Sequence, residues 1–311
     1  MQTPAKILIG LDGSDQSLVV VRYIGRVIAP PTRIVLFHVR SQIPEAFKDL
    51  AVDPSVADED SLFKIWRDQQ EATIDEFLEE ARSLLIEAGI PAAAVTVKNQ
   101  PLKAGVARDI LAEAHSNYTA LVIGRTGVGK FDGITMGSVA SKLVEAISQI
   151  PIVVVGEQPE SNKILIAVDG SMASMKATSC AAALLNPAAC EVMLCHVIRP
   201  LSVQQLGSND LFLSKKEADW ISVNQQKIVP KIVDAKRHLM AHGFTADHIS
   251  SEILTYQTSR AGAIAQAAAT GSFDTIVLGR RGFTSVEAFK IGRVCRKIIH
   301  FAYRPALWIV N

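Results

Sequence analysis

Short apolar runs and longer amphipathic stretches alternate along this chain of 311 residues. Runs rich in β-branched residues predict strands, and apolar residues spaced three and four apart predict helices between them. In the first half we expect strands near residues 5–11, 33–39, 94–98, 119–124 and 151–155. Helices are expected near residues 15–29, 61–88, 104–116 and 138–148. Because the strands are apolar on both faces, the pattern predicts a doubly wound α/β fold, a parallel sheet covered by helices on both sides.

An internal repeat relates the two halves of the chain. Three marker residues and their second copies are Asp12 and Asp169, His38 and His196, and Gly124 and Gly279. The copies lie 157, 158 and 155 positions apart, so a whole domain is repeated in order. The polar segment 157–161 breaks both periodicities. We therefore predict one domain over residues 1–156 and a second over residues 157–311.

Charge, apolar runs and cysteine spacing exclude several classes of protein. Lys and Arg number 32 against 31 Asp and Glu, a net charge of +1 that argues against a dedicated nucleic-acid binder. No apolar run approaches the ~20 residues of a membrane helix, and the N-terminal residues lack the layout of a signal peptide, so we expect a cytoplasmic protein without a membrane partner. The four cysteines lack the spacing of a disulfide framework or zinc site and are expected to be buried reduced thiols.

The candidate chemistry follows the fourth strand of the first half. The segment reads GRTGVGKFDGITMGS from Gly124 to Ser138, with the spacing G-x2-G-x9-G-S. Gly124 and Gly127 let the backbone turn sharply and bring bare N–H groups against an anion. Gly137 and Ser138 add the free N–H groups and positive dipole end of a helix, and a hydroxyl donor. The segment therefore predicts a phosphate-binding loop at the carboxyl end of a strand, where such sheets bind ligands.

Two basic residues of this loop, Arg125 and Lys130, would compensate the charge of a bound anion. Gly124-x4-Gly129-Lys130 also matches most of a Walker A motif, but Phe131 replaces the Ser or Thr that would hold magnesium. No helix is expected at Lys130, so we do not predict a P-loop NTPase. A glycine loop that serves only as a tight connection is the structural alternative.

The loop, the Asp that ends the first strand and the His-Val pair that ends the second resemble the universal stress protein family. The resemblance covers essentially the whole chain, as two tandem domains. It implies Rossmann-like, adenine nucleotide alpha hydrolase-like domains in which Asp12 contacts the nucleoside of ATP or a related adenine nucleotide, Val39 holds the adenine through its backbone, and the loop wraps the phosphates. The nucleotide-binding residues expected in the first domain are Asp12, Val39, Ile123, Gly124, Arg125, Gly127, Lys130, Gly137, Ser138 and Val139.

For the acidic turn and for the two histidines, a purely structural role is the alternative to a role in binding. With Gly13 and Ser14, Asp12 also forms a typical start of a helix. His38 and His196 precede the valines of the adenine position, yet their apolar neighbours favour packed structural histidines over a metal or acid–base role.

The second half departs from the loop pattern at one position. Arg293 stands where the first half has Ser138. With Arg280, Arg281 and Lys290 it could hold a more anionic ligand; alternatively it could fill the pocket or pair with Glu287. We expect the first site to bind nucleotide and the second to be degenerate or altered. The residues of this second site would be Asp169, Val197, Gly279, Arg280, Gly282, Gly292 and Arg293.

Each half ends in an apolar strand, residues 151–155 and 305–310. In single-domain members of the family this edge strand pairs with its twin across a dimer interface. A duplicated chain can make that pairing internally and cover both exposed edges. We therefore expect an internal pseudo-dimer, and a further homodimer is left open.

The resemblance implies a stress-response sensor or regulator that binds ATP, with or without Mg²⁺, mainly through the first domain. We predict neither catalytic residues nor a protein metal site, because no nucleophile–base pair, paired carboxylates or metal-ligand cluster stands beside the loop. Two alternatives remain: a scaffold that binds an unidentified protein partner and no nucleotide, and a slow ATPase. The acidic segment 41–60 is expected to be a solvated connection or a lid over the first site.

Overall fold

The computed structural model describes residues 4–40, 59–127, 136–157, 159–201, 211–283 and 290–311, without the side chains of residues 59–67 and 211–214. These residues form two compact units. One comprises Met1–Gly25 and Pro30–Ala146, and the other comprises Arg26–Ala29 and Ile147–Asn311. Most of the acidic segment 41–60, and Lys130 of the glycine loop, lie outside the described residues.

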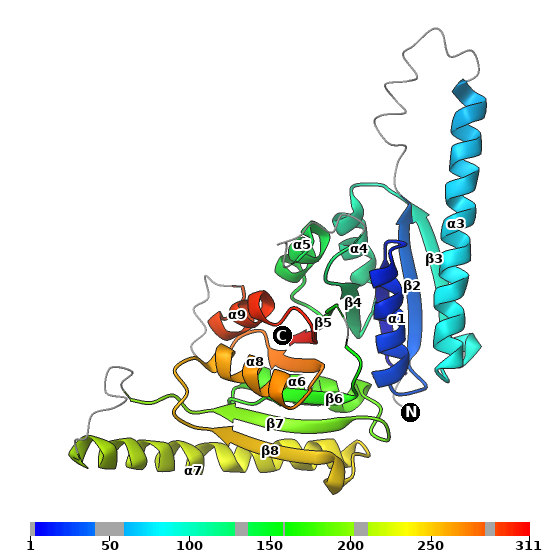
Figure 1. Cartoon of the computed structure of the whole chain (residues 1–311). Helices are drawn as coiled ribbons and strands as arrows, with labels where there is room; N and C mark the ends of the chain where they lie inside the picture. The colour runs from blue at the N-terminus through cyan, green and yellow to red at the C-terminus, as the bar shows by residue number, and fades with distance from the viewer. Residues whose placement is uncertain (1–3, 41–58, 128–135, 158, 202–210, 284–289) are drawn as a thin grey trace. The chain divides into compact units, whose positions relative to one another are not determined.

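The first unit contains a parallel sheet in the order β3-β2-β1-β4 (Figure 1). The strands are β1 (Lys6–Leu11), β2 (Arg33–Arg40), β3 (Val95–Pro101) and β4 (Ala120–Gly124). The helices are α1 (Asp15–Val27), α3 (Glu59–Glu87), α4 (Val106–Ala114) and α5 (Ser138–Ala146), with a short 3₁₀ turn at Ala92–Ala94. Every element expected in this part of the sequence is present, with ends that differ by a few residues.

Local sequence explains how these elements pack. Ile7, Leu8 and Ile9 of β1 are fully buried, as expected for a strand that is covered on both faces. Gly25 permits a close approach of α1 to α3, because a Cβ there would lie 2.8 Å from the Cβ of Ala88. Gly89 follows α3 in the left-handed region, with φ 93°, and ends the helix.

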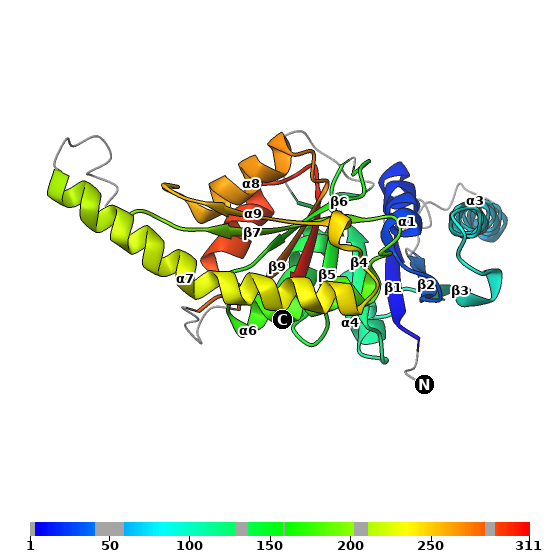
Figure 2. The same cartoon turned by 90° about the horizontal axis from the view of Figure 1, so that it is seen from below.

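The second unit contains a larger sheet in the order β5-β10-β9-β6-β7-β8. The strands are β5 (Ile152–Val155), β6 (Lys163–Ala167), β7 (Glu191–Val197), β8 (Ile249–Leu254), β9 (Thr275–Gly279) and β10 (Ala306–Val310). The helices are α6 (Met172–Leu184), α7 (Leu211–Ala241), α8 (Arg260–Thr270) and α9 (Arg293–Phe301), with a 3₁₀ turn at Ala246–His248. Helices α6 and α7 cover one face of the sheet, and α8 and α9 cover the other (Figure 2).

The closing strands of the two sequence repeats pair with each other, as expected. Strand β5 runs antiparallel to β10, with Val153 opposite Trp308, whereas the other strand pairs of this unit are parallel. Both strands are buried, and Trp308 is 0% exposed. Strand β5 thus belongs to the second compact unit although its sequence belongs to the first repeat.

Among the described helices, none is both long and apolar enough to cross a membrane.

The buried indole of Trp308 provides a test of the β5–β10 pairing. Trp308→Ala should lower the free energy of unfolding by about 3–5 kcal/mol, because it leaves a large cavity in this paired region. Urea unfolding of the purified protein measures the change. Phe301→Ala, at a residue that is 58% exposed, is the control and should change stability by less than about 1 kcal/mol. An equal loss in both variants would contradict the packing described here.

Candidate functional site

Asp12 occupies the turn between β1 and α1. Its Oδ1 accepts hydrogen bonds from the backbone N–H of Ser14 (3.1 Å), the hydroxyl of Ser14 (2.6 Å) and the hydroxyl of Ser17 (2.7 Å). Gly13 completes the turn with φ 83°, a conformation that glycine adopts without strain. One carboxylate oxygen therefore supports the start of the helix, as the structural alternative for Asp12 predicted.

The other oxygen of Asp12 lies against the glycine loop. A Cβ on Gly127 would overlap Asp12 Oδ2, so the loop backbone passes directly beside the carboxylate. The described ends of the loop also meet, because the N–H of Gly137 donates to the carbonyl of Arg125 at 2.9 Å. The structure thus brings the acidic turn, the loop and the start of α5 together at the carboxyl edge of the sheet.

Two histidines tie the second strand of each repeat to the acidic turn. His38 Nδ1 lies 2.9 Å from the carbonyl of Leu11, and His196 Nδ1 lies 2.7 Å from the carbonyl of Val168. Burial lowers the pKa of both imidazoles, which favours their neutral form, and Nδ1–H then donates to the carbonyl. The expected structural role of His38 and His196 is confirmed.

The valines that follow these histidines are also buried. Val39 is 6% exposed and Val197 is 5% exposed. Because their side chains pack into the core, any contact with a ligand would involve their backbone. Ile123, at the end of β4, is likewise buried.

The second unit repeats this geometry. Asp169 Oδ1 accepts a hydrogen bond from the N–H of Ser171 at 2.9 Å. A Cβ on Gly282 would lie 2.7 Å from Asp169 Oδ2. The N–H of Gly292 donates to the carbonyl of Arg280 at 2.8 Å. The carboxylate, the loop and the start of α9 therefore converge as they do in the first unit.

The arginine after the first glycine is buried in both loops. Arg125 is 1% exposed and Arg280 is 2% exposed. Arg280 Nε donates to the carbonyl of Lys290 at 3.0 Å, and burial lowers the pKa of its guanidinium. Arg280 therefore fixes the returning backbone of its loop. The sequence did not suggest this positioning role, because an arginine in a glycine loop is usually expected to contact the ligand.

The helices that leave the two loops begin differently. Ser138 is the first residue of α5 and Arg293 the first residue of α9, and both are exposed. Val139, next in α5, is partly buried. Gly292 precedes α9 without a side chain that caps the helix, so the first N–H groups of α9 have no side-chain acceptor at the cap position.

Two further cations at the second site were missed by sequence reasoning. Arg260 is the first residue of α8, and Arg199 follows β7 by two residues. Arg260 interacts electrostatically with Asp169, with His196 and with Arg199. The first residue of α4 is Val106, whereas the first residue of α8 is Arg260. An alignment of the two repeats would have shown this additional cation in the second one.

Within the described ranges, no group of three or more His, Cys, Asp or Glu side chains could hold a metal ion. The four cysteines are free, and Cys180 is only partly buried. Burial raises the pKa of Cys190 to about 11, and that of each other thiol to about 12. These thiols are therefore protonated at neutral pH, as expected for inert core cysteines.

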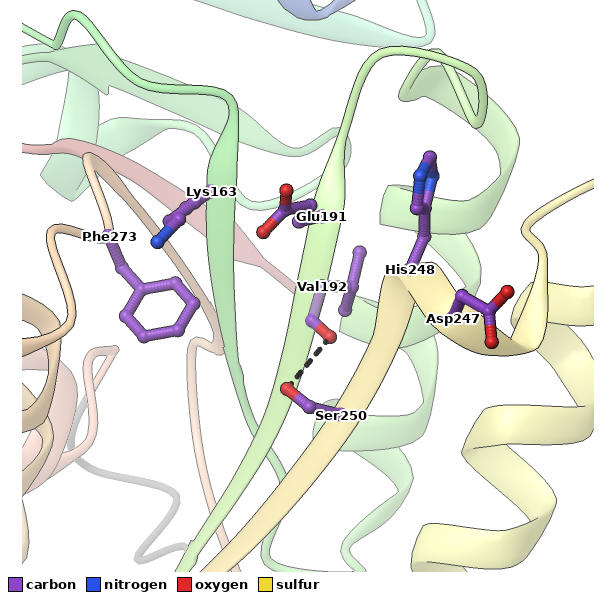
Figure 3. A pocket seen from close by; sticks show the side chains of 7 residues that line it. All are labelled: Lys163, Glu191, Val192, Asp247, His248, Ser250 and Phe273. Atoms are coloured by element: carbon purple, nitrogen blue, oxygen red, sulfur yellow. Dashed lines mark hydrogen bonds between the residues drawn. The ribbon is translucent and has the colours of Figure 1, made fainter.

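A pocket of about 250 Å³ lies at the end of the second sheet where its strands begin, opposite the carboxyl ends (Figure 3). It lies where β6, β7 and β8 begin, and Ser250 Oγ donates to the Val192 carbonyl at 3.5 Å. Its lining residues are Lys163, Glu191, Val192, Asp247, His248, Ser250 and Phe273. Because the acidic turns and glycine loops occupy the carboxyl edges, this pocket is separate from the candidate sites.

The fold and the repeated site define a tandem α/β protein with an acidic turn and a glycine loop at each carboxyl edge. A model of the universal stress protein family matches residues 4–156 and again residues 160–308. The chain therefore belongs to the universal stress protein family.

Comparisons with individual proteins are consistent with this assignment. A universal stress protein from Mycobacterium tuberculosis strain H37Rv is 28% identical over 183 residues, 56% of this chain and 57% of that relative. The match thus spans little more than half of the relative's length. The crystal structure of a universal stress protein from Archaeoglobus fulgidus DSM 4304 is 20% identical, with a TM-score of 0.58 over 98% of this chain and 97% of that chain. A functionally unknown protein from Pseudomonas aeruginosa PAO1 is 14% identical, with a TM-score of 0.51 over 99% and 92%. The two structures support the fold alone.

The lowered pKa of His38 and of His196 predicts a loss of stability in acid. Because the folded state lowers their pKa, the unfolded chain binds more protons below the ordinary histidine pKa of about 6.5. Stability should therefore fall as pH decreases through this value, by at most about 1.4 kcal/mol per pH unit for each histidine. In the double variant His38→Asn, His196→Asn, whose amides can still donate to the carbonyls, urea unfolding between pH 7 and pH 5 should show a shallower slope. His115→Asn, at an exposed position, is the control; an unchanged slope in the double variant would refute the assignment.

Proposed function

We propose that the chain binds ATP or a related adenine nucleotide at the carboxyl edge of the first unit. The observation that carries this proposal is the contact of Asp12 Oδ2 with the backbone of Gly127. It sets a hydroxyl acceptor beside a glycine loop that leads to a helix N-terminus. A nucleoside phosphate needs these groups together: a carboxylate for a ribose hydroxyl, and backbone N–H groups with a helix dipole for the phosphates.

Each residue of the first site has a role in this proposal. Asp12 Oδ2 accepts from the ribose, and the backbone of Val39 contacts the adenine beside the buried Ile123. Gly124, Gly127 and Gly137 let the loop backbone approach the phosphates. The remaining groups are the exposed hydroxyl of Ser138, the first turn of α5 with Val139, the buried charge of Arg125 and the amine of Lys130.

A magnesium ion fits this site only as a partner of the phosphates. Asp12 is the carboxylate that the described residues set against the loop, whereas Mg²⁺ usually takes one or two carboxylates together with phosphate oxygens and water. The ion, when bound with ATP, neutralises phosphate charge.

We infer that the site serves a sensor or regulator of the stress response and is not built for rapid turnover. Asp12 Oδ1 is already engaged by Ser14 and Ser17, and the buried imidazole of His38 is directed to the Leu11 carbonyl. Neither group is arranged to accept a proton from an attacking water.

We expect the protein to act in the cytoplasm, together with a protein partner that is not identified.

Substitution of the loop glycines tests the proposal and its asymmetry. Gly127→Val should abolish ATP binding at the first site, because the side chain would collide with Asp12. Gly282→Val, the matched change in the second loop, should leave most ATP binding intact. Isothermal titration calorimetry measures affinity, and thermal unfolding checks that each variant folds. For the wild type, ATP at 100 times Kd should stabilise the fold by about 2.7 kcal/mol.

The competing functions predict different results. A scaffold that binds no nucleotide predicts no co-purified nucleotide after denaturation and no thermal shift with ATP. A slow ATPase predicts phosphate release that Gly127→Val abolishes. Equal loss of ATP binding in the Gly127 and Gly282 variants would refute the asymmetry between the sites.

A further inference from the structure

The carboxyl edge of the second unit carries cations at positions where the first unit has neutral side chains. Between the first two loop glycines, Arg281 takes the place of Thr126. At the start of the helix after each loop, Arg293 takes the place of Ser138. Both arginines are exposed. The second loop is therefore suited to a ligand with more negative charge.

One group of cations lies at the described ends of the second glycine loop and at the start of the helix that follows it. It consists of Arg281, Lys290 and Arg293, beside the first N–H groups of α9. Arg280 holds the loop from beneath through its 3.0 Å hydrogen bond to the Lys290 carbonyl, which fixes the backbone that carries Lys290. This group provides a site for a phosphate chain, because arginine donors and a helix N-terminus both favour phosphate oxygens.

A second group of cations lies away from the loop, where β7 ends and α8 begins. It consists of Arg199, two residues after the end of β7, and Arg260, the first residue of α8. Helix α7 holds the backbone of Arg199, because Trp220 Nε1 donates to the Arg199 carbonyl at 3.0 Å. Ser259 caps α8 by accepting from the N–H of Gly262 at 3.2 Å, and Arg260 is the first residue of this helix.

The positive charges of Arg199 and Arg260 act against each other. Burial and the charge of Arg199 both lower the pKa of Arg260, and the charge of Asp169 opposes this effect. In the first unit, by contrast, Arg40 at the end of β2 forms an ion pair with Glu71 at 2.8 Å. Within the described ranges, none of the five cations at the second site forms a salt bridge with a carboxylate.

Asp169 contacts the loop and also acts electrostatically on the second group. One of its oxygens contacts the backbone at Gly282 in the loop, and its charge acts on Arg260 at the start of α8. In dinucleotide-binding folds a carboxylate holds a free ribose hydroxyl, and a neighbouring arginine accommodates a phosphate on that ribose. The second unit has both kinds of group at its carboxyl edge, with Asp169 after β6 and Arg260 at the start of α8, whereas α4 of the first unit begins with Val106.

We propose that the second site binds a nucleotide that carries one phosphate on its ribose ring and another on its 5′ position. Arg199 and Arg260 bind the ribose phosphate, and Arg281, Lys290, Arg293 and the start of α9 bind the 5′ phosphate. This proposal rests on the proposed function, because it places a nucleotide at the second carboxyl edge in the orientation expected at the first.

The test compares ligands of equal phosphate number. Adenosine 3′,5′-bisphosphate and adenosine 2′,5′-bisphosphate are titrated against ADP by calorimetry into the full chain carrying Gly127→Val, which isolates the second site. At least one bisphosphate should bind about tenfold tighter than ADP, because its second phosphate meets the additional arginine pair. Arg260→Gln should remove this preference and leave the affinity for ADP within about threefold.

Two further variants separate this effect from general electrostatics. Arg293→Gln should weaken bisphosphate and ADP alike, because both place a phosphate at the loop. Lys163→Gln, which removes a positive charge at the opposite edge of the sheet beside the pocket of Figure 3, should change neither affinity. Thermal unfolding confirms that each variant is folded.

Several outcomes would overturn the proposal. It fails if neither bisphosphate binds tighter than ADP, or if the preference survives in Arg260→Gln. It also fails if the Gly127→Val protein binds no nucleotide while the wild type binds ATP, a result that leaves the proposed function of the first site standing. If the wild type binds no nucleotide at all, both proposals fall together.

Discussion

Each site depends on one close contact, between the carboxylate at the end of a strand and the backbone of a glycine in the loop. Asp12 meets Gly127, and Asp169 meets Gly282, at a separation that leaves no room for a Cβ. The contact requires that the first and fourth strands lie side by side in parallel, so that their carboxyl ends reach the same edge. It also requires a fixed turn, which the histidine-to-carbonyl hydrogen bonds provide from the neighbouring strand. The sheet order, the buried histidines and the loop glycines thus serve one local geometry.

Much of this arrangement could be predicted because it follows from residue patterns with direct physical meaning. Alternating apolar runs and amphipathic stretches identify the strands and helices, since each face of a parallel sheet must be covered. The glycine spacing also predicted the loop, because glycine permits a sharp turn and a close approach of the backbone; the approach of Gly127 to Asp12 is visible only in the structure. The paired closing strands were also predictable, because an apolar edge strand needs a partner.

Other features were not accessible, for reasons that concern tertiary context. Arg125 and Arg280 carry a residue type that is usually exposed, and only the fold reveals that they lie beneath their loops. Arg260 belongs to a helix whose start is distant in sequence from the loop, and its place beside Asp169 depends on how β7 and α8 meet the same edge. Side chains that reach a site from separate elements leave no local motif.

The pairing of β5 with β10 has a consequence for the evolution of the two sites. When two edge strands belong to one polypeptide, their encounter is intramolecular, and its effective concentration is set by the intervening chain and is independent of expression level. The pairing of these two strands therefore does not depend on the concentration of the protein. Selection can therefore act on each copy separately, because a substitution such as the arginine at position 293 changes one site and leaves its sister unaltered.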